Sequence, residues 1–214
     1  MRNSKLMFVI VPMIALSTLA GCAGKIRYPS YYVLNVPTSV FAGDQSKPIL
    51  GPVALREFSA PGFLKGGAIA YRPSPEQVDF YDYHRWAEDP RRVVTTAMAR
   101  EMQARRLFQS VDLFDGRGTP EYLLTGVIDH LEEVDQGSNV SIEVSLSARL
   151  INLRTGDVLW QGASSKTAKV DHRSIPGLVA EMSRDLTDAV DGLVSSMQDR
   201  VTSASATASS LNKE

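Results

Sequence analysis

The sequence is poor in the residues that most often carry chemistry. It has one cysteine and three histidines in 214 residues, so no disulfide can form within the chain. His84, His130 and His172 are far apart and form no HExxH or other metal-ligand spacing. The sequence contains neither a GxSxG nucleophile motif nor a glycine-rich phosphate loop. We therefore predict no catalytic residue, no cofactor and no metal site, as expected for a protein that is not an enzyme.

An excess of one charge and long hydrophobic runs are also missing. The chain has 23 basic and 24 acidic residues, a net charge of −1, which argues against a nucleic-acid partner. The longest apolar run, residues 6–16, contains Pro12 and is too short to span a bilayer, which takes about 20 apolar residues. Hydrophobic residues make up 43% of the chain, a normal value for one globular domain of this length.

The N-terminus has the pattern of a secretory signal peptide. Arg2 and Lys5 precede the apolar run, and small residues follow it up to Gly21 and Cys22. The sequence Leu-Ala-Gly-Cys at 19–22 resembles the lipobox of bacterial lipoproteins. The resemblance implies that a diacylglycerol is attached to Cys22, that the leader is cleaved between Gly21 and Cys22, and that the new amino group is acylated, typically with palmitate. The alternative is an ordinary secretory signal followed by a coincidental cysteine.

Lipidation explains the single cysteine and predicts where the protein resides. One acyl chain anchors only marginally, whereas two or three hold a protein in a membrane durably, at about 0.8 kcal/mol per buried CH₂. Ala23 replaces the aspartate that resembles an inner-membrane retention signal, which favours the inner leaflet of the outer membrane, facing the periplasm. We divide the chain into a leader, a lipidated tether, a folded domain and a disordered tail of small polar residues, at 1–21, 22–30, 31–200 and 201–214.

Hydrophobic periodicity predicts an α+β fold. The strongest strand signal is the strict apolar–polar alternation over residues 141–150, followed by a turn at 154–157 and a returning strand that carries Trp160, which we expect in the core. Asp89 and Pro90 form a helix start signal. Strands are predicted at 31–36, 49–58, 68–71, 78–83, 111–114, 122–134, 141–150 and 158–170, and helices at 90–106 and 176–200. This order indicates a single domain with a mostly antiparallel or mixed sheet and two main helices packed on it.

Three segments carry a family resemblance. Tyr-Tyr-Val-Leu at 31–34, Ile-Leu-Gly-Pro-Val at 49–53 and Tyr-His-Arg-Trp-Ala-Glu-Asp-Pro at 83–90 resemble the ABC-type transport auxiliary lipoprotein family. The resemblance implies a non-catalytic outer-membrane partner of a periplasmic MCE-domain lipid conduit, with an inner-membrane permease and an ATPase as separate chains. Some relatives form rings, which implies a homo-oligomer. The aromatic run from Phe80 to Tyr83 departs from the commonest pattern and leaves the cargo and the partner surface open.

A different machine is the alternative. The segment Thr-Gly-Asp-Val-Leu-Trp at 155–160 resembles the small α+β domains of lipoproteins that activate cell-wall synthases or act as secretion pilots. Because fold does not fix function, we keep this second interpretation.

Two clusters are candidate sites. Arg85 and Trp86, with Tyr81 and Tyr83, are candidates for partner binding because tryptophan and arginine are enriched in binding hot spots. For the first two we favour a structural role, in which Trp86 fills the core and Arg85 pairs with an acid near the helix start. A second cluster is acidic, and we interpret it as a solvated strand end rather than a divalent-ion site; its members are Asp129, Glu132, Glu133 and Asp135.

Overall fold

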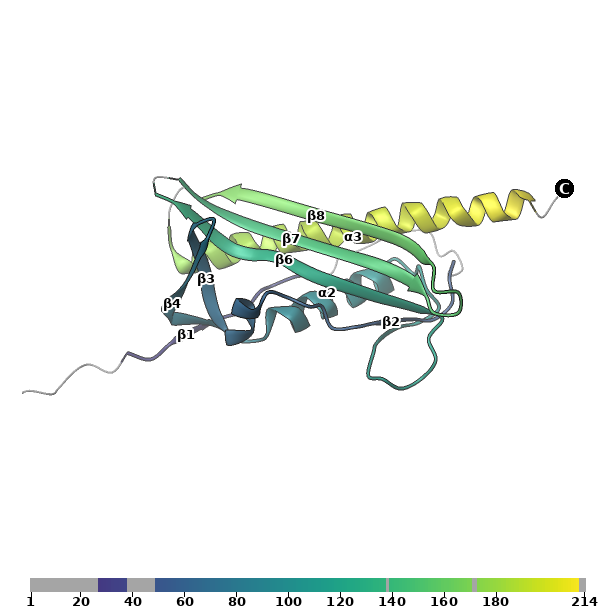
Figure 1. Ribbon diagram of the computed structural model, residues 1–214, viewed down its shortest axis with the longest axis horizontal. Coiled ribbons are helices and arrows are strands. Elements are labelled where there is room, and N and C mark those ends of the chain that lie inside the picture. The colour runs from purple at the N-terminus through teal and green to yellow at the C-terminus, as the bar shows by residue number, and fades with distance from the viewer. Residues whose placement is uncertain (1–26, 38–48, 138, 171–172, 212–214) are drawn as a thin grey trace, which may run out of the picture.

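The computed structural model describes residues 27–37, 49–137, 139–170 and 173–211. An eight-stranded mixed sheet forms one layer, and two helices form the other (Figure 1). This arrangement confirms the predicted α+β class and the single domain. The predicted leader, the lipidation site Cys22 and the first part of the tether lie outside the described residues.

A long antiparallel meander forms the largest part of the sheet. It consists of β6 (Tyr122–Gln136), β7 (Asn139–Asn152) and β8 (Val158–Lys169). The apolar positions of β7 face inward and are buried, as the alternation predicts; they are Ile142, Val144, Leu146, Ala148 and Leu150. The turn between β7 and β8 is closed by Gly156 with φ of 82°, a backbone conformation that favours glycine. Trp160 is buried, as predicted.

The shorter strands flank β6 on its other edge. β2 (Val53–Leu55) pairs with the first part of β6 and with β5 (Val111–Leu113), in both cases in parallel. β3 (Ala68–Ser74) pairs in parallel with the last part of β6, and β4 (Gln77–Trp86) and β1 (Ser30–Tyr32) continue the sheet outward. A 3-10 helix, η2 (Gly62–Gly66), precedes β3. The segment between β2 and β3 therefore runs alongside the middle of β6.

The first two strands are shorter than predicted because the residues that follow them leave the sheet and pack elsewhere. After β1 the chain leaves the sheet, so that Leu34 enters the core and the backbone N–H of Asn35 donates to Ser183 Oγ at 3.1 Å. After β2 the chain turns toward the helical layer, where Phe58 is buried. Apolar and β-branched residues predicted the burial of these segments but not their departure from the ladder.

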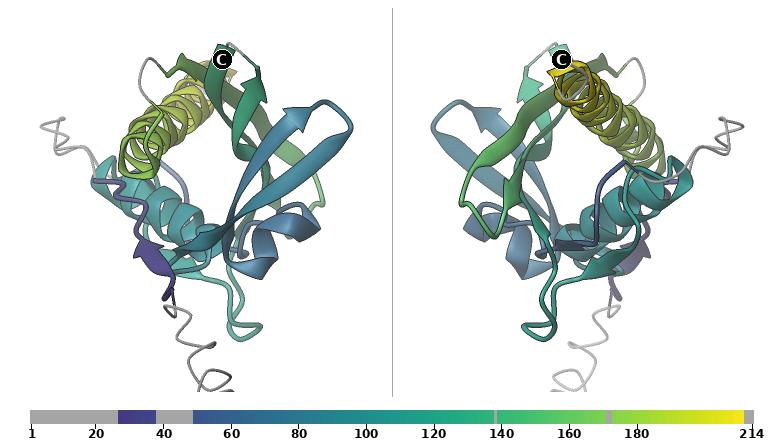
Figure 2. Two further views of the ribbon diagram at one scale, coloured as in Figure 1. Left: turned by 90° about the vertical axis from the view of Figure 1, so that its left-hand side faces the viewer. Right: turned by 90° about the vertical axis from the view of Figure 1, so that its right-hand side faces the viewer.

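Helices α2 (Pro90–Ala104) and α3 (Ile175–Leu211) lie on the same side of the sheet (Figure 2). Asp89 caps α2, since its Oδ1 accepts a hydrogen bond from the Arg91 backbone N–H at 2.9 Å. The apolar side chains of both helices face the sheet and are buried, as expected for amphipathic helices; they include Val94, Met98, Met102, Met182, Leu186, Val190 and Val194. The opposite face of the sheet is covered by neither α2 nor α3 (Figure 2).

An ion pair joins the two helices. The Arg105 guanidinium contacts Asp191, and it also donates to Glu101 Oε1 at 2.9 Å and Ser195 Oγ at 2.7 Å. On the sheet side, Trp160 Nε1 donates to Ser196 Oγ at 3.2 Å. Asp191 is therefore part of the contact between the helices.

The C-terminal prediction needs a correction. We expected α3 to end near Arg200 and residues 201–214 to be disordered, but α3 continues to Leu211, and Val201 is buried in the core. Extending an existing helix costs far less than nucleating one, and alanine-containing sequence supports the extension. Residues 212–214 lie outside the described part of the chain.

Candidate functional site

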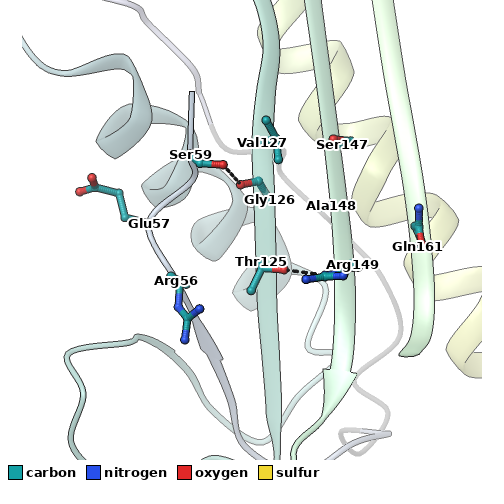
Figure 3. Close-up of a pocket in the computed structure, with 10 residues that line it drawn as sticks. All are labelled: Arg56, Glu57, Ser59, Thr125, Gly126, Val127, Ser147, Ala148, Arg149 and Gln161. Carbon is teal, nitrogen blue, oxygen red and sulfur yellow. Dashed lines mark hydrogen bonds between the residues drawn. The ribbon is translucent and has the colours of Figure 1, made fainter. Parts of the chain in front are cut away.

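A concave surface lies on the sheet face opposite α2 and α3, and we call it the sheet groove (Figure 3). It has a volume of about 480 Å³. It is lined by the segment after β2 and by β6, β7 and β8, through Arg56, Glu57, Ser59, Thr125, Gly126, Val127, Ser147, Ala148, Arg149 and Gln161. Three strands and one irregular segment therefore meet in one depression.

The groove exists because β6 is only partly paired on one edge. Along this edge, between the parts of β6 that pair with β2 and with β3, the irregular segment that contains Phe58 and Ser59 lies beside the strand. The Ser59 backbone N–H donates to Gly126 O at 2.9 Å, and the Ile128 N–H donates back to Ser59 O at 2.8 Å. These two bonds hold the segment against the strand without completing a ladder, and they leave a hollow beside it.

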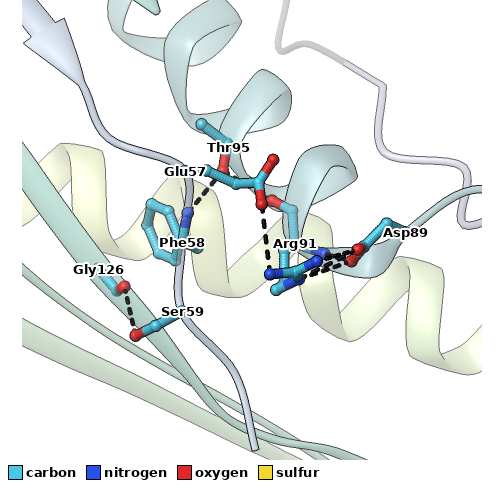
Figure 4. Close-up of polar contacts among 7 residues, drawn as sticks. All are labelled: Glu57, Phe58, Ser59, Asp89, Arg91, Thr95 and Gly126. Atoms are coloured by element: carbon cyan, nitrogen blue, oxygen red, sulfur yellow. Dashed lines mark hydrogen bonds and ion pairs between the residues drawn. The ribbon is translucent and has the colours of Figure 1, made fainter. Parts of the chain in front are cut away.

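Gly126 and Thr95 fix this segment on its two sides (Figure 4). A Cβ atom at Gly126 would lie 2.3 Å from the Phe58 ring, so only glycine lets the buried ring pack against β6. From the helix layer, Thr95 Oγ1 accepts a hydrogen bond from the Phe58 backbone N–H at 2.9 Å. This segment, which lines one side of the groove, is therefore bonded to both layers of the protein.

The groove contains charges of both signs. Arg149 Nε donates to Thr125 Oγ1 at 3.2 Å, and the Arg56 guanidinium carbon lies 5.5 Å from the centre of the Phe114 ring. Both guanidinium groups belong to exposed residues and are positioned to bind an acidic group, because arginine forms two parallel hydrogen bonds with a carboxylate. Glu57, at the rim, lies 3.4 Å from Arg91.

The Glu57 side of the groove is connected to the start of α2. Arg91 Nε donates to both carboxylate oxygens of Asp89, at 3.0 and 3.1 Å. The hydrogen bonds from the Arg91 side chain hold the pKa of Asp89 below its usual value, and the same contact raises the pKa of Arg91. Arg91, and not Arg85 as we expected, is thus the arginine that pairs with an acid at this helix start.

The predicted acidic cluster is not solvated throughout, and Glu133 is the first exception. This side chain is fully buried on the helix side of β6, where its Oε2 accepts a hydrogen bond from the Tyr81 hydroxyl at 2.5 Å. Arg173 Nη2 lies 2.6 Å from Glu133 Oε1, and Arg173 Nη1 lies 2.7 Å from Asp135 Oδ2. Burial, and then the bond to Glu133, raise the pKa of Tyr81. The network ties β4, β6 and the residues before α3 together.

Glu132 is also fully buried, but it points to the other face of the sheet. Its Oε1 accepts from Arg72 Nε at 2.8 Å and lies 3.2 Å from His130 Nδ1. The solvated interpretation was wrong for both glutamates, because β3 and β4 bring cationic and hydroxyl partners to the end of β6. No group of three acidic, histidine or cysteine side chains in the described chain is placed to hold a metal ion.

The four predicted partner-binding residues of β4 divide between two faces. Trp86 is in the core and Tyr81 belongs to the buried network. Tyr83 is 43% exposed, and the exposed Arg85 lies directly opposite Tyr31 of β1. Tyr83 and Arg85 are therefore the more exposed members of this set, and Tyr81 is partly buried. Partner binding stays a prediction.

Sequence reasoning missed the groove arginines. Arg149 occupies a polar position of the alternating strand, but nothing local indicates that it lies across β6 from Arg56, which is 93 residues earlier by its number in the chain. Only the pairing of the segment after β2 with β6 brings the two together.

Among the described residues, no helix combines the length and apolarity required to cross a membrane.

The comparisons agree with this fold. The solved structure of protein XCC0632 from Xanthomonas campestris is similar, with a TM-score of 0.69 and 16% identity over 82% of this chain and 99% of that one. The structure of an uncharacterized protein gives a TM-score of 0.61 and 12% identity over 80% and 99%. A comparison with curated protein sequences gives no match.

The family comparison is more specific than these structural likenesses, which show the fold alone. Residues 32–194 match the model of the ABC-type transport auxiliary lipoprotein component. The match spans α2, the part of α3 up to residue 194 and every strand except the start of β1, and it confirms the resemblance carried by the segments at 31–34, 49–53 and 83–90. The chain therefore belongs to the family of ABC-type transport auxiliary lipoproteins.

Proposed function

We propose that this protein is the lipid-anchored, non-catalytic auxiliary component of an MCE-type intermembrane lipid transport system. The family match over residues 32–194 is the observation that carries the proposal. Acylated Cys22 holds the protein in the inner leaflet of the outer membrane. The folded domain docks the periplasmic MCE-domain conduit, while a permease and an ATPase in the inner membrane supply the energy.

The sheet groove is the docking surface that the geometry favours. It is open, it lies on the sheet face opposite α2 and α3, and the segment that lines it is fixed by Gly126 and Thr95. Arg56 and Arg149 suit an acidic side chain on the partner, since charge-assisted bonds from arginine are strong and geometrically selective. Such a surface recognises a folded protein rather than carrying out a reaction.

Site-specific photo-crosslinking in cells tests the proposal. A photoreactive amino acid replaces Gln161 in the groove, and in a matched variant it replaces Ala180, an exposed residue on α3. We expect the Gln161 position to crosslink to an MCE-domain protein and the Ala180 position to give little or no such product. A second variant, Arg149→Glu, should reduce the Gln161 product severalfold. Equal products from both positions, or none from the groove in a protein made at normal levels, would contradict groove docking.

A further inference from the structure

Exposed aromatic and basic side chains occur on β4, on β1 and on the residues just before β1. Tyr28 is 80% exposed and Tyr31 63% exposed, and Tyr83 is also on the surface. The Arg27 guanidinium carbon lies 5.9 Å from the centre of the Tyr83 ring. Together with Arg85, these residues form a surface that we call the tether face.

The strand register explains why Tyr31 and Arg85 share one face. β1 pairs in parallel with β4, so that Tyr31 lies opposite Arg85 while the next pair is Tyr32 and Trp86. Because side chains alternate across a strand, the second pair points inward, where Trp86 is buried. Tyr31 and Arg85 consequently point outward together. Packing within the domain does not require exposed aromatics here, and exposed apolar patches commonly mark interaction sites.

The predicted anchor limits what this face can contact. Arg27 follows Cys22 by five residues and Tyr31 follows it by nine. At a maximum of about 3.6 Å per residue, Arg27 can lie no more than about 18 Å from Cys22 and Tyr31 no more than about 32 Å. Acyl chains on Cys22 would therefore keep these residues within about 32 Å of the attachment point.

We propose that the tether face lies against the phospholipid headgroups of the membrane that holds the anchor. Tyrosine favours this depth because its ring is apolar and its hydroxyl is polar. Arg27 and Arg85 can donate hydrogen bonds to lipid phosphates, which are strong acceptors for guanidinium. The contact orients the protein, because β1 and β4 lie at one end of the long axis and the β7–β8 turn lies at the other (Figure 1). The proposal rests on the lipid anchor of the proposed function but not on the transport partner.

Fluorescence quenching in vesicles tests the orientation. The mature lipidated protein is placed in phosphatidylethanolamine–phosphatidylglycerol vesicles whose acyl chains are brominated near the headgroup. Tyr31→Trp is compared with Leu113→Trp, a position that is 55% exposed and lies outside the tether face. Both native tryptophans are buried, and the unsubstituted protein gives their background. We expect at least threefold stronger quenching for Tyr31→Trp, and equal quenching at the two positions would overturn the proposal.

A second measurement asks whether the face itself makes the contact. In a Tyr28→Trp protein, the paired substitutions Tyr83→Ser and Arg85→Ser should lower quenching at least twofold, whereas Arg154→Ser in the β7–β8 turn should not. Unchanged quenching after the paired substitutions would also overturn the proposal. These vesicles contain no transport protein, so a failure here leaves the crosslinking test of the proposed function intact, and the converse holds as well.

Discussion

Replacing Gly126 by alanine should destabilise the domain by forcing the sheet apart from the Phe58 segment that lines the groove. The new Cβ would lie 2.3 Å from two atoms of the Phe58 ring, whereas carbon atoms normally contact at about 3.5–4.0 Å. The ring is 1% exposed and its backbone N–H is bonded to Thr95, so it cannot swing into solvent. Overpacking of this kind costs about 1–3 kcal/mol, which lowers Tm by about 2–12 °C for a chain of this size.

Urea and thermal unfolding of the chain without its first 22 residues, followed by circular dichroism, measure this cost. Gly62→Ala is the matched control, because nothing lies within 4 Å of its Cβ position, and it should change stability by less than about 0.5 kcal/mol. Phe58→Leu removes the ring atoms that clash, so the double variant with Gly126→Ala should be less destabilised than the sum of the single variants by about 1 kcal/mol. Strict additivity, or a Gly126→Ala protein as stable as the wild type, would refute the packing explanation.

Two further predictions concern buried charge. Arg173→Met should lower the free energy of unfolding by about 3 kcal/mol, the low end for breaking a buried pair, because Arg173 itself keeps 42% of its side chain exposed. Unfolding in urea should show that adding Glu133→Gln recovers most of the loss. A double variant no more stable than the single one would contradict this. Burial, and then repulsion from Asp188, raise the pKa of Asp185 in the folded protein, so its contribution to stability falls as pH rises through that raised pKa. Asp185→Asn should therefore raise Tm at pH 7, with a gain that vanishes at about pH 3, below the ordinary aspartate pKa; a gain that grows in acid would have the wrong sign.

Much of the fold could be predicted because the signals were local. The alternation over residues 141–150 reports one buried and one wet face, and it requires no knowledge of the neighbouring strands. Asp89 and Pro90 likewise place the start of α2 correctly, since capping depends on the first turn alone. The turn before Trp160 is marked in the sequence by its glycine, and Trp160 is buried as expected.

The charged cluster could not be read in the same way. Glu132 and Glu133 look like ordinary strand-end acids, but Arg72 lies 60 residues from Glu132 in sequence, and Tyr81 lies 52 residues from Glu133. Their burial depends on β3 pairing with β6 in parallel, a long-range contact that leaves no periodic pattern. Composition also misled the prediction at 201–211, because small polar residues are typical of tails but are tolerated in a helix that is already formed.

The groove shows the same limit at a functional surface. Gly126 gives a local hint, since glycine inside a strand often marks a close approach, but the approaching group is Phe58 from a segment that leaves the ladder. Arg56 and Arg149 become neighbours of one depression only after this approach.

Mass spectrometry of the tagged, full-length protein purified from detergent-solubilised envelopes is the most direct test of its proposed role. We expect the mature chain to begin at acylated Cys22 and an MCE-domain protein to co-purify with its permease and ATPase. Recovery of a cell-wall synthase or a secretion channel in their place, or of a chain with an unmodified thiol at Cys22, would contradict the proposed role in lipid transport.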